Sequence, residues 1–165
     1  MFRVLSDPAI YEFENSPPES EEWLTARYRR LESRGPPDGR ETWLNWVVRL
    51  PGAGLAGYVQ ATVLPGSVAL VAYELNSRHW RQGIGSDAVA AVLEELRAHY
   101  GVRRYVAVLK SRNVRSQGLL RRLCFEPAAE EEARSYRDEP DELVMFRAAG
   151  EPGPASGRKR EAGAD

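Results

Sequence analysis

The middle of the chain alternates short apolar runs with turns that are rich in proline and glycine. The runs occupy residues 42–50, 55–64 and 68–75, and the turns occupy residues 51–54 and 65–67. The runs have the composition of strands, because they are rich in β-branched and aromatic residues. Since parallel strands need a much longer crossover, such short connections join antiparallel neighbours. The pattern therefore predicts an antiparallel meander.

A longer amphipathic segment follows the meander. Apolar residues recur at steps of four from Ile84 to Tyr100, and Gly101 stands where a glycine cap ends a helix, which predicts a helix over residues 85–100. The next apolar run, residues 104–110, follows this helix, so we expect it to lie parallel to the run at 68–75. The sequence therefore predicts an α/β (α+β) fold with a mixed central sheet, in which the meander precedes a β-α-β unit.

Further elements are expected on both sides of this core. Ser16 precedes two prolines and an apolar stripe of helical period, which predicts a helix over residues 16–31 with Ser16 as its cap. A second amphipathic helix is expected over residues 114–123, and closing strands at Phe125 and residues 142–147. From Gly150 the apolar period ends. We expect one domain at residues 1–149 and a disordered tail at 150–165.

Composition and charge exclude several classes of protein. The 165 residues hold 23 basic and 24 acidic side chains, and this balance argues against a general nucleic-acid binder. No apolar run approaches the roughly 20 residues of a membrane span, and the N-terminus lacks the pattern of a signal peptide. The single cysteine, Cys124, fits a reducing compartment. We therefore expect a cytoplasmic monomer or homodimer with no nucleic-acid or membrane partner. His79, His99 and Cys124 lack metal-ligand spacing, so no metal is expected.

The most informative segment joins the run at 68–75 to the helix at 85–100. It contains Gly83 and Gly85, which are separated by one residue. Backbone N–H groups can therefore converge at the start of the helix without a Cβ in the way, and the helix dipole favours an anion there. The segment is a candidate cradle for a pyrophosphate.

Two classes of nucleotide cofactor use such a cradle. Residues 83–88 match the dinucleotide fingerprint G-x-G-x-x-(G/A). That fold, however, places the first glycine almost directly after the strand, and here seven residues separate Leu75 from Gly83. The fingerprint also requires an acidic residue after the next strand, where this chain has Lys110-Ser111-Arg112. These two differences disfavour a dinucleotide site.

The stretch Trp80-Arg81-Gln82-Gly83-Ile84-Gly85 instead resembles the acetyl-CoA site of the GNAT superfamily of N-acetyltransferases, whose signature is (Q/R)-x-x-G-x-(G/A). Two more stretches fit the RimJ/RimL-like branch of that superfamily: Asn113-Val114-Arg115-Ser116 with Leu119-Leu120-Arg121-Arg122-Leu123-Cys124-Phe125, and Leu5-Ser6-Asp7-Pro8 near the start. Trp80 and Cys124 depart from the family pattern. The resemblance covers about residues 4–148.

By this resemblance the chain starts late. Family members usually begin with a strand well before the Asp7-Pro8 motif, which here stands almost at the N-terminus. We expect the first family strand to be missing, through a late start codon or a truncation.

The resemblance also implies where acetyl-CoA binds. The sheet should splay between the fourth and fifth family strands, here those ending at Leu75 and Lys110. The pantetheine arm would pair with the backbone of Tyr73, Glu74 and Leu75 in the manner of an added strand, and Asn113 would contact the arm. The pyrophosphate would be held by main-chain N–H groups of Arg81, Gln82, Gly83, Ile84, Gly85 and Ser86.

Direct attack of an amine on a thioester needs a base, an oxyanion donor and a group that stabilises the leaving thiolate. A backbone N–H near Leu75 is the expected oxyanion donor. The resemblance implies Ser116 for the thiolate, because the tyrosine that many family members use corresponds to Leu120. The alternative for Ser116 is a local hydrogen bond to the helix cap.

The base is less defined by the sequence. Glu74 is the nearest carboxylate, because the position of one family glutamate is occupied by Val108. By strand alternation Glu74 could instead point to the helix-covered face and pair with an arginine. Glu12, Glu14 and a water chain remain open as alternatives.

Charge is unevenly distributed along the chain. Residues 78–122 carry ten basic and three acidic side chains, whereas residues 1–22 carry one basic and six acidic side chains. A basic cofactor side and an acidic amine side would suit a transferase, although two solvated faces explain the pattern equally well. We expect an acetyl-CoA-dependent N-acetyltransferase that acts by direct attack on a primary amine, either a protein N-terminus or a small molecule. The alternative is a catalytically weak acyl-CoA-binding or partner-binding module.

Overall fold

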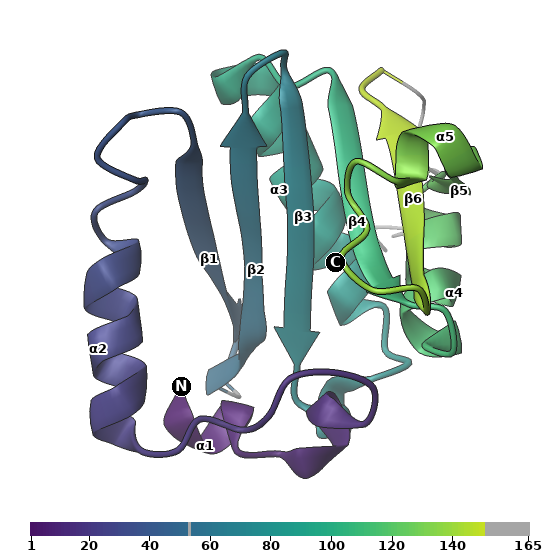
Figure 1. The fold of residues 1–165 in the computed structure, drawn as a ribbon. Coiled ribbons are helices and arrows are strands. Elements are labelled where there is room, and N and C mark those ends of the chain that lie inside the picture. Colours follow the sequence, from purple (N-terminus) through teal and green to yellow (C-terminus); the bar gives the residue numbers. More distant parts are fainter. Residues whose placement is uncertain (53, 151–165) are drawn as a thin grey trace, which may run out of the picture.

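A mixed six-stranded sheet forms the centre of the computed structural model, which describes residues 1–52 and 54–150 (Figure 1). The strand order is β1-β2-β3-β4-β6-β5. The strands are β1 (Thr42–Leu50), β2 (Gly54–Leu64), β3 (Val68–Leu75), β4 (Arg104–Lys110), β5 (Glu126–Pro127) and β6 (Glu142–Ala148). Only β3 and β4 pair in parallel, and every other pair is antiparallel. The predicted meander, mixed sheet and parallel pair are therefore confirmed.

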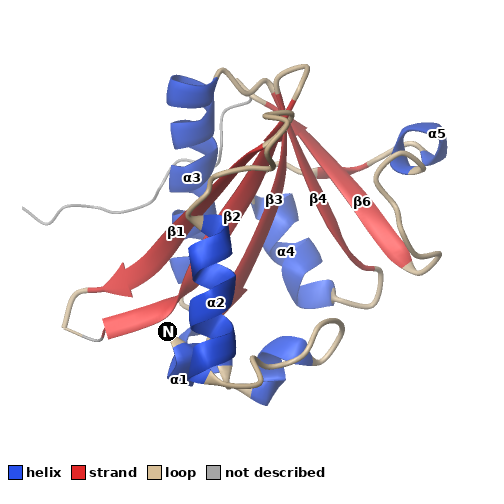
Figure 2. Ribbon diagram, turned by 60° about the vertical axis from the view of Figure 1, so that its left-hand side comes forward, coloured by secondary structure: helices blue, strands red, loops and turns tan. Residues whose placement is uncertain are grey.

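Helices α3 (Ile84–Tyr100) and α4 (Val114–Arg122) cover one face of this sheet (Figure 2). Buried residues of α3 pack onto alternate residues of the strands and form the main core, which includes Val89, Leu96, Val59, Val71 and Tyr105. The Tyr105 hydroxyl donates to the carbonyl of Leu93 at 2.7 Å, so this buried polar group is paired. Gly101 ends α3 with a φ of 64°, as a left-handed glycine cap.

The N-terminal part of the chain and α2 (Glu21–Leu31) lie on the other side of the sheet (Figure 2). The predicted cap is wrong, because Ser20 rather than Ser16 accepts the first free amide of the helix, from Trp23 at 3.0 Å. A residue before proline is pushed out of the helical region. Ser16 and Pro17 each precede a proline, so the helix begins only after Pro18.

Three short helical elements have no counterpart in the sequence-based prediction. They are α1 (Phe2–Leu5), the 3-10 turn η1 (Pro8–Tyr11) and α5 (Glu130–Ala133). The first two run across the carboxyl end of β3 (Figure 1). A second 3-10 turn, η2 (Ser77–His79), follows β3 directly.

Two predictions about the ends of the chain remain predictions. Except for Gly150, the tail expected at residues 150–165 lies outside the described residues. β1 forms one edge of the sheet, and among residues 1–52 and 54–150 no strand pairs with its outer side. The expected loss of a preceding family strand depends on the length of the natural product, so it stays a prediction.

Candidate functional site

The sheet opens between β3 and β4. Their parallel pairing includes only Val68–Leu70 and Arg104–Val106, after which the two strands diverge. β4 stays paired with β6 along its whole length, from Arg104 to Lys110. The strands therefore fan apart toward the carboxyl ends of β3 and β4 (Figure 2). This is the predicted splay.

The backbone at the end of β3 faces this gap at alternate residues. The Asn76 amide donates to the carbonyl of Ala56 at 2.9 Å, toward β2. Because backbone groups alternate in direction along an antiparallel pair, those of Glu74 also face β2, whereas those of Tyr73 and Leu75 face the gap. The sequence-based candidates thus differ in what they offer: Tyr73 and Leu75 present main-chain groups to the gap, and Glu74 presents its side chain to one side of it.

The loop after β3 turns into α3 through two residues with positive φ. Arg81 has a φ of 59° and Gly83, the N-cap of α3, a φ of 81°. The first helical hydrogen bond runs from Asp87 to the carbonyl of Gly83, so the amides of Ile84, Gly85 and Ser86 precede the hydrogen-bonded ladder. The loop before α3 and the first turn of α3 therefore have the form of an anion cradle. The Gln82 side chain folds back onto the carbonyl of Arg78.

Gly85 lets the start of α3 approach α4. A Cβ at this position would lie 2.9 Å from the Cδ1 atom of Leu119 and 3.8 Å from a methyl group of Leu75. The glycine therefore allows close packing between the cradle, α4 and the end of β3.

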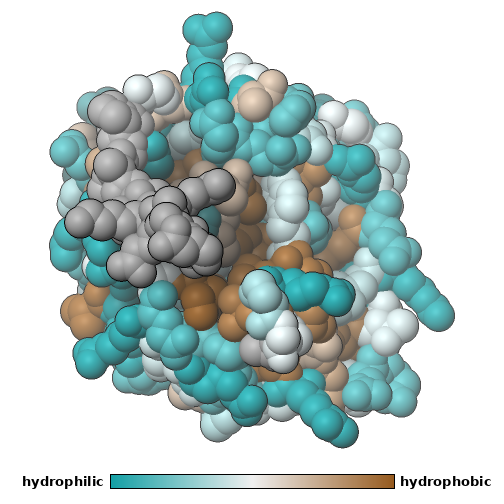
Figure 3. Space-filling model, turned by 180° about the vertical axis from the view of Figure 1, so that it is seen from behind, coloured by the Kyte–Doolittle hydropathy of each residue, from teal (hydrophilic) through white to brown (hydrophobic). Residues whose placement is uncertain are grey.

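The start of α4 closes the gap on the helix-covered side. Asn113 is the N-cap, and its Oδ1 atom accepts from the Ser116 amide at 3.1 Å. The Tyr73 hydroxyl donates to the carbonyl of Ser116 at 3.4 Å. The structure thus brings Tyr73, Asn113 and Ser116 together beside the gap. Seen from this side, hydrophobic surface gathers in a hollow that hydrophilic side chains surround (Figure 3).

Glu74 lies on the opposite face of the sheet. Its side chain shares that face with Tyr58, its cross-strand neighbour on β2. The Tyr11 hydroxyl donates to the Leu5 carbonyl at 2.8 Å, and a longer contact of 3.4 Å joins it to Oε2 of Glu74. Burial raises the pKa of Glu74 above its ordinary value of 4.5, and hydrogen bonds from Tyr58 and Tyr11 act in the opposite direction. Glu74 does not lie under α3 and α4, which was one of the two orientations that the sequence left open.

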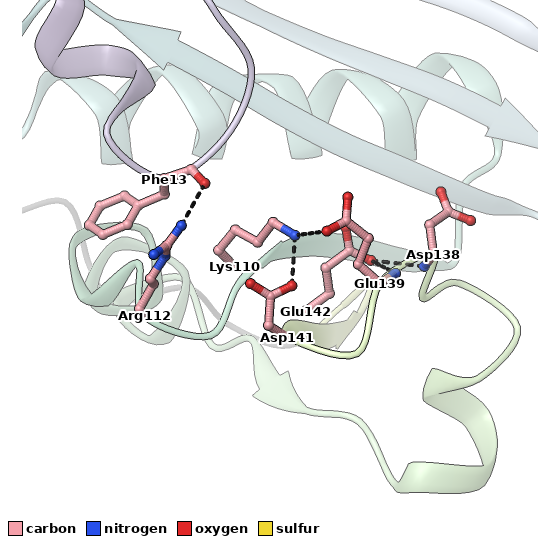
Figure 4. A network of polar contacts seen from close by, with 7 residues as sticks. All are labelled: Phe13, Lys110, Arg112, Asp138, Glu139, Asp141 and Glu142. Carbon is pink, nitrogen blue, oxygen red and sulfur yellow. Dashed lines mark hydrogen bonds and ion pairs between the residues drawn. The ribbon is translucent and has the colours of Figure 1, made fainter.

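A polar cluster lies at the end of β4, on the same face as Glu74 (Figure 4). The Lys110 side chain is only 8% exposed and forms ion pairs with Glu139 at 2.6 Å and Asp141 at 2.7 Å. These two carboxylates raise the pKa of Lys110. Burial raises the pKa of Glu14, and the charge of Glu142 adds to the effect while Lys110 opposes it. This side of the gap is therefore rich in carboxylates.

Sequence comparison identifies the family. Residues 1–126 match the family model described as the acetyltransferase (GNAT) domain, which is more than half of the chain. The chain belongs to the GNAT acetyltransferase family. A search of the curated proteins found no match.

Solved structures show that this GNAT protein has the fold of known acetyltransferases. The spermidine N-acetyltransferase of Vibrio cholerae, solved with CoA and spermine, superposes with a TM-score of 0.70 at 14% identity, over 89% of this chain and 86% of that one. Mycobacterium smegmatis RimJ, solved with CoA-disulfide, gives 0.64 at 20% identity over 78% and 62% of the two chains. The aminoglycoside acetyltransferase AAC(6')-Ib, solved with CoA, gives 0.68 at 18% identity over 90% and 87%.

Acetyl-CoA, the predicted co-substrate, agrees with membership of the GNAT family and with the CoA present in these solved structures. Among residues 1–52 and 54–150, no three His, Cys, Asp or Glu side chains are placed to hold a metal ion. Within the same part of the chain, no helix combines the length and apolar character that a bilayer crossing needs.

Sequence reasoning missed three side chains of the candidate site. The indole N–H of Trp80 donates to the carbonyl of Leu75 at 2.8 Å, and the guanidinium of Arg115 lies 4.5 Å from the centre of the Trp80 ring. Tyr11 reaches Glu74 from 63 residues away in sequence. Trp80 and Arg115 stand within the recognised motifs, but their contacts with other elements leave no periodic signal in the sequence.

Proposed function

We propose that this protein is an acetyl-CoA-dependent N-acetyltransferase of the RimJ/RimL-like branch that acts by direct attack of a primary amine. The main support is the gap at the end of β3, where the backbone of Tyr73 and Leu75 faces an unpaired stretch of the sheet and the chain then enters the cradle. The sequence stretches at Asp7-Pro8, 80–85 and 113–125 support the choice of branch.

The residues present fit the co-substrate. An arm that contains amides can form hydrogen bonds with the backbone of Tyr73 and Leu75, as an added strand does. The amides of Ile84, Gly85 and Ser86 would hold the pyrophosphate, together with the loop residues Arg81, Gln82 and Gly83. Asn113 would border the arm from the start of α4. Acetyl-CoA supplies the activated carbonyl, and the protein holds it between the two strands.

The two candidate catalytic side chains lie on opposite sides of this gap. Glu74 lies on the face of the N-terminal segment, and Ser116 lies beside Tyr73 on the face of α4. In direct attack the amine approaches on one side while the thiolate leaves on the other. Glu74 would take the proton of the amine, directly or through water, and Ser116 would donate a hydrogen bond to the thiolate. The Leu75 amide, which faces the gap, is the proposed oxyanion donor.

The face of the gap on which Glu74 lies, here called the acceptor side, would attract amines that are protonated in solution. Carboxylates of Glu74, Glu14, Glu139, Asp141 and Glu142 lie there, and the cations Lys110, Arg27 and Arg112 offset only part of their charge. Such a surface raises the local concentration of cationic amines. The acceptor is either a protein N-terminus or a small-molecule amine, in a protein that we expect to be a cytoplasmic monomer or homodimer with its domain at residues 1–149.

Thiol release from acetyl-CoA tests this proposal. The full chain would be incubated with acetyl-CoA and, separately, with spermidine, an aminoglycoside and a peptide with a free N-terminal alanine. Release that depends on the amine, with an acetylated product seen by mass spectrometry, supports the proposal. A chain that does not bind CoA by calorimetry would refute it.

The second candidate is a catalytically weak acyl-CoA-binding or partner-binding module. Leu120 occupies the position of the family tyrosine and is 1% exposed in the core, so this position supplies no acid. Val108 likewise stands at the position of one family glutamate. CoA binding without turnover on any amine of a wide panel would favour this alternative.

A further inference from the structure

Residues 11–14, which we name the strap, cross from the end of β3 to the start of α4. The chain before the strap is tied to the end of β3 by two hydrogen bonds. The Asp7 carboxylate accepts from the Ser77 amide at 2.7 Å, and the Val4 carbonyl accepts from the Asn76 side chain at 3.1 Å. The Tyr11 hydroxyl donates to the Leu5 carbonyl at 2.8 Å and makes a longer contact of 3.4 Å with Glu74. One end of the strap is therefore fixed to β3.

Arginines near the start of α4 hold the other end of the strap. The Arg115 guanidinium lies 5.0 Å from the centre of the Phe13 ring and forms an ion pair with Glu12. Arg112 donates to the Phe13 carbonyl at 3.4 Å, and its side chain points toward this residue (Figure 4). The long hydrogen bond from Arg112 is the weaker of these ties.

The same guanidinium also contacts the cofactor loop. Arg115 lies 4.5 Å from the centre of the Trp80 ring, so it is placed between two aromatic rings, Phe13 and Trp80. A planar guanidinium stacks in this way and an ammonium group does so less well. Trp80 in turn is fixed to β3 through the Leu75 carbonyl. Arg115 therefore joins the strap, α4 and the loop that precedes the cradle.

We propose that Arg115 is a positioning residue that fastens the strap across the end of the β3–β4 gap. By holding the strap, Arg115 keeps Tyr11 and Glu14 near Glu74, on the face from which the amine approaches. This inference rests on the proposed acetyltransferase function. Arg115 acts through Phe13 and Glu12, on the residues that face the amine. Loss of Arg115 should leave the cofactor loop in place, because the hydrogen bond between Trp80 and Leu75 does not depend on it.

Hydrogen exchange of the free protein tests the structural part. In Arg115→Gln, the amides of residues 9–14 should exchange at least about tenfold faster, which corresponds to about 1.4 kcal/mol. Arg97→Gln is the matched control, because it breaks an exposed ion pair with Glu94 on α3, at a comparable exposure and away from the strap. Equal exchange of residues 9–14 in Arg115→Gln and in the unmodified protein would overturn the proposal.

Kinetics with the full chain test the functional part, with spermidine and an alanyl peptide as acceptor probes. We expect Arg115→Gln to raise the acceptor KM about tenfold, while kcat and the KM for acetyl-CoA change by less than about threefold. Phe13→Leu should give the same pattern, and the double variant should be little worse than either single variant, since both remove one stack. Arg115→Lys should recover only part of the loss.

The outcomes separate the two proposals. A rise in the KM for acetyl-CoA with no change in the acceptor KM would overturn the role of Arg115 and leave the proposed function intact. If the unmodified protein binds CoA but acetylates neither probe, the proposed function fails for these acceptors. The exchange of residues 9–14 then decides the role of Arg115 by itself.

Discussion

Gly57 on β2 lies opposite the end of β3, and we predict that Gly57→Ala damages the site from a distance. A Cβ at this position would lie 2.8 Å from the Cα atom of Leu75 and 2.9 Å from the carbonyl carbon of Glu74, and the Glu74 carbonyl oxygen is closer still. Ordinary contact begins at 3.4 Å. All three atoms belong to the backbone, so the two strands must move apart by roughly 0.6 Å or more, since no flexible side chain can give way.

The expected cost follows from this displacement. Overpacking of a well-packed region costs about 1–3 kcal/mol. In a folded part of this size, each kcal/mol lowers Tm by about 2–4 °C. A displacement near 1 Å of the groups that hold the reacting atoms can lower the rate by on the order of 100-fold. We therefore expect Gly57→Ala to lose both stability and kcat/KM, measured by thermal unfolding and by thiol release.

The matched control is the same substitution on α4. A Cβ at Gly118 would lie 3.7 Å from an Arg122 nitrogen, which is ordinary contact. Alanine also favours the helix over glycine by about 0.5–1 kcal/mol. Gly118→Ala should therefore unfold at a slightly higher temperature and keep its activity. If Gly57→Ala unfolds like the unmodified protein and retains full kcat/KM, the close approach of β2 and β3 does not position the site.

Three further predictions concern single side chains. Glu74→Gln should lower kcat by about 100-fold or more through loss of the base. Burial raises the Glu74 pKa above 4.5, so the charged carboxylate opposes folding at neutral pH. The variant should therefore unfold at the same or a higher temperature. An unchanged kcat would exclude Glu74 as the base. Ser116→Ala should lower kcat with little change in the KM for acetyl-CoA, and rapid-quench kinetics would show whether the chemical step has slowed. Lys110→Met should lower Tm at pH 7, because it removes the ammonium group that pairs with the carboxylates of Glu139 and Asp141. In the unmodified protein the Asp141 pKa is lowered on folding. The stability that this shift contributes is complete above the ordinary pKa of 3.8 and is lost as the pH falls through the lower folded pKa. A pH titration of Tm in both proteins checks this last prediction.

The sheet could be predicted from the sequence because its signals are local. β1, β3 and β4 begin and end at the predicted residues. Each is a short apolar run; turns rich in Pro and Gly separate the first three strands, and β4 follows a helix that ends at Gly101. The N-terminal residues behaved differently. Residues 1–15 have no apolar period, and contacts with residues far along the chain hold them in place, such as that of Asp7 with Ser77. No local rule could place them.

The candidate site divides in the same way. The cradle follows from two glycines and a helix start, which are features of adjacent residues. The face on which Glu74 lies could not be decided, because a strand alternates and nothing local says which face the helices cover. The contact of Trp80 with Arg115 depends on where α4 lies relative to the loop. Such contacts are set by tertiary structure alone.

The short parallel pairing of β3 with β4 has a thermodynamic consequence. The two halves of the sheet share only a three-residue register, so the strand ends beyond it lack the cross-strand hydrogen bonds that make a sheet cooperative. A ligand whose amides occupy that space adds cross-strand hydrogen bonds that the polypeptide itself does not supply. Ligand concentration then becomes a variable of folding, since a ligand present at 100 times its Kd stabilises the native state by about 2.7 kcal/mol. In this sense the cofactor would serve as a seventh strand of the sheet.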